Sequence, residues 1–159
     1  MLNRRLIRIK VFKVLYSCIS SGSNSFAEAE KNMHYSCEKP LHLYCFMLNA
    51  AVALKQAADA KIETGMRKFN PTEEERNPNL KFSENKVSEY LLGNPVFKKY
   101  CEENVLSWNG DLALFVKKLF ASISEKDYFK EYMERESRSM AEDCDLFIRI
   151  FEEEFEDNE

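Results

Sequence analysis

The chain has 159 residues, of which 45% are hydrophobic and 31% charged, a composition typical of a folded globular domain rather than a disordered segment. It contains only four glycines and four prolines, which argues against an all-β sandwich with many tight turns and favours an all-α fold. The net charge is −4, and the first residues alternate basic and apolar types, unlike a secretory signal. No apolar run approaches the roughly 18 residues that a membrane span needs, so a cytoplasmic protein is expected.

Three helices are predicted in the first part of the chain, over about residues 3–20, 26–37 and 38–68. The first ends at the Ser/Gly/Asn-rich run 20–25, where a glycine can close it. Ser25 and Glu28 have the capping-box spacing that starts a second helix. Pro40 is tolerated only in a first turn, so a new helix is predicted to begin there, with apolar residues recurring at helical spacing.

A polar stretch that contains Pro71 and Pro78 is predicted to separate two subdomains. The expected division is a three-helix bundle over 1–70, a loop or linker over 71–80, and a second helical subdomain over 81–159. Capping residues and apolar spacing predict five further helices, over about 83–92, 94–103, 111–120, 124–133 and from 139 onward. Ser83 is expected to cap the first of these helices and Ser139 the last. The prediction is about eight helices and no strand.

The residues that could carry chemistry give little support for an enzyme. The five cysteines are widely spaced, odd in number and form no Cys-x-x-Cys pair, which favours free thiols over disulfides or a zinc site. A cysteine hydrolase built on Cys37 or Cys45, with His34 or His42 nearby in sequence, stays open as an alternative. There is no glycine-rich phosphate loop and no Gly-x-Ser-x-Gly elbow. No catalytic residue, metal ligand or cofactor is predicted.

The charges are unevenly distributed along the chain. Residues 1–27 contain five basic and no acidic residues, whereas residues 142–159 contain nine acidic residues and one basic residue, so different partners are expected at the two ends. The acidic stretch 152–157 is interpreted as a solvated helix end. Arg4, Arg5 and Arg8 fall within an arc of about 100° on a helical wheel. Guanidinium groups near Tyr16 would suit RNA phosphates and unstacked bases, although the charges alone favour a basic, solvated first turn.

The order of these segments resembles the bacterial transcription antitermination factor family NusB. The segment 4–8 (RRLIR), followed by 15–17 (LYS), resembles the arginine-rich opening helix of that family. The segment 43–49 (LYCFMLN) resembles its Leu-Tyr-Phe-x-x-Leu-Leu element. The resemblance extends from Asn3 to about Phe69, under half of the chain.

The resemblance implies an all-α, NusB-like fold and a role in transcription antitermination and ribosomal RNA synthesis. It implies binding to boxA-type nascent RNA together with NusE, a small-subunit ribosomal protein, within the RNA polymerase antitermination complex. By this resemblance, the three arginines of the segment 4–8 would contact RNA, with Tyr16 as their neighbour. Lys10 and Lys13 are added because of their charge and not because of the family motif. The predicted RNA-binding residues are Arg4, Arg5, Arg8, Lys10, Lys13 and Tyr16.

The second half of the chain departs from the family. The later family signature, a Val-Ala-Ile-Asn-Glu-Ala helix followed by Phe-Val-Asn-Gly-Val-Leu, is not found, and the region from Pro71 looks like an enlarged central portion. A fragment of a longer protein is therefore expected, with a natural acidic end as the alternative. A homodimer stays open. The alternative function is a helical protein-protein interaction module that binds no RNA.

Overall fold

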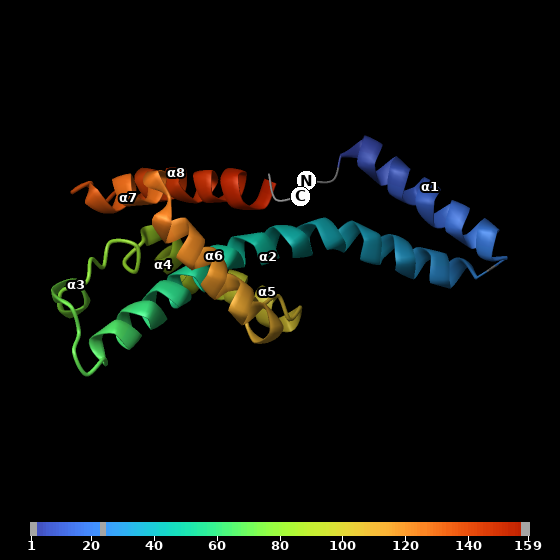
Figure 1. Ribbon diagram of the computed structural model, residues 1–159. Coiled ribbons are helices and arrows are strands. Elements are labelled where there is room, and N and C mark those ends of the chain that lie inside the picture. Colours follow the sequence, from blue (N-terminus) through green and yellow to red (C-terminus); the bar gives the residue numbers. More distant parts are fainter. Residues whose placement is uncertain (1–2, 23–24, 157–159) are drawn as a thin grey trace. The chain divides into compact units, whose positions relative to one another are not determined.

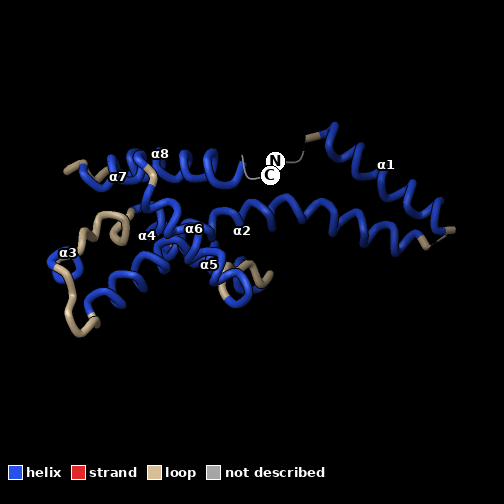
Figure 2. Tube along the Cα trace, in the orientation of Figure 1, coloured by secondary structure: helices blue, strands red, loops and turns tan. Residues whose placement is uncertain are grey.

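The computed structural model describes residues 3–22 and 25–156, and every regular element in these ranges is helical (Figures 1 and 2). The predicted all-α class and the number of about eight helices are confirmed. The α-helices are α1 (Arg4–Ser21), α2 (Phe26–Met66), α3 (Glu73–Arg76), α4 (Lys86–Gly93), α5 (Pro95–Glu103), α6 (Ala113–Glu125), α7 (Asp127–Glu134) and α8 (Met140–Phe151). A 3-10 turn over Gly110–Leu112 precedes α6, and a π-helical turn over Glu152–Glu156 follows α8. The predicted loop residues Ser23 and Asn24, and the acidic end 157–159, lie outside the described residues.

Capping side chains fix most of the helix starts. Asn3 caps α1 by accepting from the Leu6 N–H at 2.9 Å, and Gly22 ends this helix in the left-handed conformation, as predicted. Ser139 caps α8, also as predicted. The prediction that Ser83 caps α4 is wrong, because the Asn85 side chain accepts from two N–H groups of the first turn.

The second and third predicted helices form one helix, α2, with Pro40 inside it. Proline has no N–H to donate, so the carbonyl of Ser36, four residues earlier, loses its helical donor. The Lys10 ammonium of α1 donates to that carbonyl at 2.5 Å and to the Ser36 hydroxyl at 3.1 Å. The break predicted at Pro40 is absent because a lysine from the neighbouring helix supplies the missing donor.

The predicted loop 71–80 contains the short helix α3. Its first turn is a capping box, in which Thr72 and Glu75 each accept from the backbone N–H of the other. Glu75 also pairs with Lys68, which lies just beyond α2. The two prolines therefore flank a helical turn rather than an irregular linker.

The chain divides into two compact units, Met1–Cys45 and Phe46–Glu159, so the boundary falls within α2 rather than at the predicted loop 71–80. The first unit is a hairpin of α1 and the start of α2, two helices rather than the three predicted (Figure 1). No residue of α1 is buried. The boundary lies this early because the later part of α2 contributes a row of buried alanine and leucine residues to the second unit, namely Ala50, Ala51, Ala53, Leu54 and Ala58.

The core of the second unit is apolar and rich in aromatic rings. Its fully buried side chains Leu54, Ile123 and Ile150 come from α2, α6 and α8. The Phe82 ring lies 5.6 Å from the Phe120 ring and 5.2 Å from the Phe129 ring, distances at which aromatic pairs attract each other. The segment before α4 is thereby held against α6 and α7.

A cluster of buried polar groups joins α4, α7 and α8 in the second unit. The Tyr132 hydroxyl donates to the Asp143 carboxylate at 2.7 Å and accepts from the Asn85 amide at 3.3 Å. Lys81 is only 4% exposed and donates to the backbone carbonyl oxygens of Tyr132 and Arg135. Each group has a hydrogen-bond partner, as burial of polar groups requires.

The acidic end of the described chain is not fully solvated, contrary to the sequence interpretation. Glu154 is 7% exposed, and its carboxylate lies 3.6 Å from the Lys126 ammonium and 3.5 Å from the Tyr128 hydroxyl. Burial, followed by the negative charges of Glu154 and Glu153, raises the pKa of Tyr128. The sequence pattern of consecutive acids did not reveal this buried position.

Val105 ends α5 in a left-handed conformation, with a φ of 54°. Its N–H donates to the Glu102 carbonyl at 3.2 Å, and the next N–H, of Leu106, donates to the Cys101 carbonyl at 2.8 Å. These two bonds form the Schellman end of a helix, at the position where glycine is preferred. A β-branched residue is strained at such a φ.

Replacing Val105 with glycine is expected to raise the free energy of unfolding of the second unit by about 1 kcal/mol. The left-handed conformation costs an L-residue roughly 1–2 kcal/mol, and the greater unfolded-state entropy of glycine cancels part of the gain. No burial is lost, because Val105 is 84% exposed. Urea unfolding followed by the fluorescence of Trp108 measures the change. Val96→Gly, at another exposed valine inside α5, is the control and is expected to lower the free energy of unfolding. Equal losses of this free energy in both variants would contradict the strain at Val105.

Candidate nucleic-acid interface

One side of α1 combines cationic and aromatic side chains. The exposed Leu15 and Ile19 fall within an arc of about 120° at 100° per residue, together with five exposed cationic and aromatic residues. These five define the arginine–aromatic face: Arg4, Arg5, Arg8, Phe12 and Tyr16. Since each residue adds about 1.5 Å along a helix, the face is about 18 Å long. The absence of glycine and proline from the helix keeps it continuous over this length.

The aromatic part of this face is a pair of rings one helical turn apart. The Phe12 and Tyr16 ring centroids are 6.2 Å apart with an interplanar angle of 22°. The two residues are 68% and 64% exposed, so much of their ring surface contacts solvent. Flat, exposed rings of this kind can stack on nucleic-acid bases. Phe12 was not among the predicted site residues, although its position four residues from Tyr16 and Arg8 places it on their face.

The cationic part of the face consists of three guanidinium groups with no carboxylate partner among the described residues. Arg4, Arg5 and Arg8 are all exposed. Guanidinium groups bind phosphate oxygens through paired hydrogen bonds and remain charged at any physiological pH. The predicted grouping of the three arginines is therefore present, and they are available to an anionic partner.

The two predicted lysines lie off the arginine–aromatic face. The side chain of Lys10 is half-buried, and its ammonium is bonded to Ser36 of α2. Its environment identifies Lys10 as a structural residue of the hairpin. Lys13 is exposed but projects about 120° away from the centre of the face. The structure thus brings four of the six predicted residues together, with Phe12 added.

The hairpin also exposes an unusual amount of apolar surface. Between its helices lies a cavity of about 230 Å³, lined mainly by Val11, Val14, Leu15, Phe26, Ala29 and Met33. Phe26 and Ile19 are 82% and 80% exposed. Among its described residues, Cys45 is the one buried hydrophobic side chain. Two helices without a core gain little stability alone, so this surface suits a partner.

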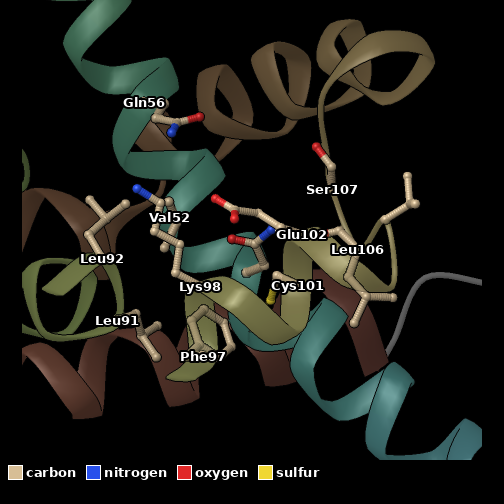
Figure 3. Close-up of a pocket in the computed structure, with 12 residues that line it drawn as sticks. Val52, Gln56, Leu91, Leu92, Phe97, Lys98, Cys101, Glu102, Leu106 and Ser107 are labelled. Atoms are coloured by element: carbon tan, nitrogen blue, oxygen red, sulfur yellow. The ribbon is translucent and has the colours of Figure 1, made fainter. Parts of the chain in front are cut away.

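A second hollow, of about 360 Å³, lies in the second unit (Figure 3). Val52 of α2, Leu91 of α4 and Phe97 of α5 form its apolar walls, and the strained Val105 lies at its edge. Figure 3 shows Cys101 among these side chains, with no histidine lining the hollow. The described lining therefore holds no nucleophile–base pair of the kind a cysteine hydrolase needs.

The two cysteines of the cysteine-hydrolase alternative, Cys37 and Cys45, both lie on α2 in the first unit. Burial raises the pKa of the Cys45 thiol, which favours the neutral form over the nucleophilic thiolate. Cys37 is half-buried on α2. Within the described residues, no group of three His, Cys, Asp or Glu side chains is placed to hold a metal ion. In the same part of the chain, no helix is long and apolar enough to cross a membrane.

Comparison of the chain with protein-family models, with curated proteins and with solved structures gives no match. Its candidate interface is therefore defined by its own geometry: an exposed helix with two stacked rings and three arginines that have no carboxylate partner among the described residues.

Proposed function

We propose that the chain is an RNA-binding adaptor that holds single-stranded RNA on the arginine–aromatic face. One observation carries the proposal: three exposed arginines and a stacked pair of exposed aromatic rings share one side of α1. In this mechanism, the guanidinium groups bind phosphates, and unstacked bases lie against Phe12 and Tyr16. Duplex RNA fits less well, because its bases are stacked inside and cannot reach the rings.

The resemblance to the NusB family makes the proposal more specific. The resemblance suggests a boxA-type element as the RNA, a NusE-type ribosomal protein as the partner, and transcription antitermination in the cytoplasm as the process. The exposed apolar surface of the hairpin supports a protein partner in addition to RNA. A protein partner that covers this surface would stabilise the hairpin and so present α1 to the RNA.

Replacing Arg4, Arg5 and Arg8 together with alanine is expected to weaken binding of single-stranded boxA-type RNA about tenfold or more near physiological salt. The plot of log affinity against log salt should become shallower by about 2, since each phosphate contact on a single strand contributes about 0.7 to the slope. Fluorescence anisotropy at several salt concentrations measures both quantities. Helical content, measured by circular dichroism, should hardly change because all three side chains are exposed.

Two further variants test whether RNA affinity depends on the arginine–aromatic face or only on the positive charge of α1. Lys13→Ala removes one charge from the same helix but off the face, and should change the affinity little. The double variant Phe12→Ala with Tyr16→Ala leaves the charge unchanged and should still weaken binding, because ring stacking contributes about 1–3 kcal/mol per base. Unchanged affinity in the triple arginine variant would contradict the proposed interface.

A second function, docking of a protein partner without RNA, is favoured by the exposed apolar surface of the hairpin. Measuring RNA binding with and without the ribosomal partner separates the two. Binding of the partner in the absence of any RNA affinity would favour the protein-interaction module. RNA affinity that the partner strengthens would favour the adaptor.

A further inference from the structure

A third hollow, of about 390 Å³, lies in the second unit between α2 and α6. Ala57, Ala60 and Gly65 of α2 and Ala121 of α6 leave it open because their side chains are small. The ring of Phe120 completes an apolar floor. The space falls within the size range of ordinary small-molecule sites.

The rim of this hollow is cationic. It carries Lys61, Lys68 and Lys117, with Glu75 as its single acidic residue. Glu75 already pairs with Lys68, so the ammonium groups of Lys61 and Lys117 dominate the rim. The Lys61 ammonium lies 5.5 Å from the Phe120 ring centroid and 3.4 Å from the Ser124 hydroxyl, and is therefore held over the floor.

This cluster of positive charges lies in a unit whose net charge is negative. The second unit, residues 46–159, contains 24 acidic and 16 basic residues. Helical surfaces commonly pair a lysine with an acidic residue one turn away, as Lys55 pairs with Asp59 on α2. The hollow instead gathers three lysines around an apolar floor in an acidic unit, an arrangement that would attract an anion and bury its apolar part.

We propose that this hollow binds a small amphipathic anion, with an apolar body on the alanine–phenylalanine floor and a carboxylate or similar group at Lys61 and Lys117. Compact, hydrated ammonium groups suit a small anionic head. An acyl chain and an aromatic ring both suit the apolar body, since either can lie on small side chains and the face of a phenylalanine.

The test is a titration of the isotope-labelled full chain with decanoate and, separately, with 1-naphthoate, followed by amide NMR shifts. Saturable shifts at Ala57, Ala60 and Ala121 are expected with at least one of the two, and the stronger ligand identifies the body as acyl or aromatic. The uncharged analogues decanol and 1-naphthalenemethanol should bind at least tenfold more weakly. Equal binding of the uncharged analogues would show that the lysines do not select an anion and would overturn the proposal.

Variants assign the binding to the hollow. Lys61→Gln with Lys117→Gln should weaken the anion about tenfold, while Lys118→Gln, next in sequence but outside the lining, should leave it unchanged. Ala121→Phe should fill the hollow and remove binding; circular dichroism verifies that each variant is folded. Shifts confined to the hairpin, no shifts with either probe, or full affinity in the double lysine variant would each overturn the proposal.

Discussion

Replacing Lys81 with methionine is expected to lower the free energy of unfolding of the second unit by about 3 kcal/mol. The lysine stem is buried, and its ammonium donates to the carbonyl oxygens of Tyr132 at 2.5 Å and Arg135 at 2.7 Å. These carbonyls lie at the end of α7, where no helical N–H remains to satisfy them. Methionine retains most of the apolar stem but provides no donor, so two acceptors lose their partner in a buried site.

Electrostatics add to this loss. The Lys81 ammonium lies 4.3 Å from the centroid of the Tyr132 ring and 3.6 Å from the Glu142 carboxylate. Removing the cation leaves this carboxylate close to the protein interior with fewer partners, although Arg135 remains 3.8 Å away. Breaking such a pair by removing one member costs more than the pair contributes to stability.

Urea unfolding followed by Trp108 fluorescence measures the loss in Lys81→Met. The matched control is Lys86→Met, because the Lys86 ammonium also donates to a backbone carbonyl, that of Arg138 at 2.8 Å, but at an exposed site. The control should lose less than about 0.5 kcal/mol, as surface changes usually do. Similar losses in both variants would contradict the capping role of Lys81.

Much of the fold could be predicted from local sequence signals. Asn3 and Gly22 mark the ends of α1, and Ser139 marks the start of α8, because caps act within four residues of the backbone that they satisfy. The helical wheel likewise grouped Arg4, Arg5 and Arg8, since a wheel needs only the helix itself.

The errors arose where a distant residue decides the local structure. The predicted break at Pro40 fails because Lys10 donates to the carbonyl of Ser36, 26 residues later in the chain, which the proline leaves unpaired. Lys81 in a polar segment carries no sequence sign of burial, since the carbonyls that it binds are more than 50 residues away. The boundary within α2 was missed for the same reason: the small residues that follow Cys45 are buried only against helices from later in the chain.

Asp143→Ala is expected to lower the free energy of unfolding by about 3–4 kcal/mol. Asp143 is 3% exposed and joins two elements through its carboxylate. One oxygen accepts from the Tyr132 hydroxyl of α7 at 2.7 Å, and the other accepts from the Lys86 N–H at 2.8 Å. That N–H belongs to the first turn of α4, so an aspartate from α8 caps a helix distant in sequence. Alanine leaves the buried Tyr132 hydroxyl and the partly buried Lys86 N–H without their acceptor.

The strength of the Tyr132–Asp143 bond can be separated from the capping of α4. Burial, and then the bond to Asp143, raise the pKa of Tyr132, so its hydroxyl stays protonated and remains a donor. A double-mutant cycle with Tyr132→Phe should give a coupling energy of about 1.5–3 kcal/mol, the range for a hydrogen bond to a charged group. Asp145→Ala, at an exposed position on the same helix, is the control and should cost less than about 0.5 kcal/mol.

The cycle distinguishes two ways in which Asp143 could stabilise the second unit. If the coupling is large, the bond between α7 and α8 carries much of the effect, and Tyr132→Phe should remove most of the same stability. If Asp143→Ala lowers the free energy of unfolding equally in the parent and in the Tyr132→Phe variant, the stabilisation comes from the cap on α4 instead. Asp143→Asn should then recover part of the loss, because its amide oxygen can still accept from the Lys86 N–H. A loss no greater than that of Asp145→Ala would contradict both roles.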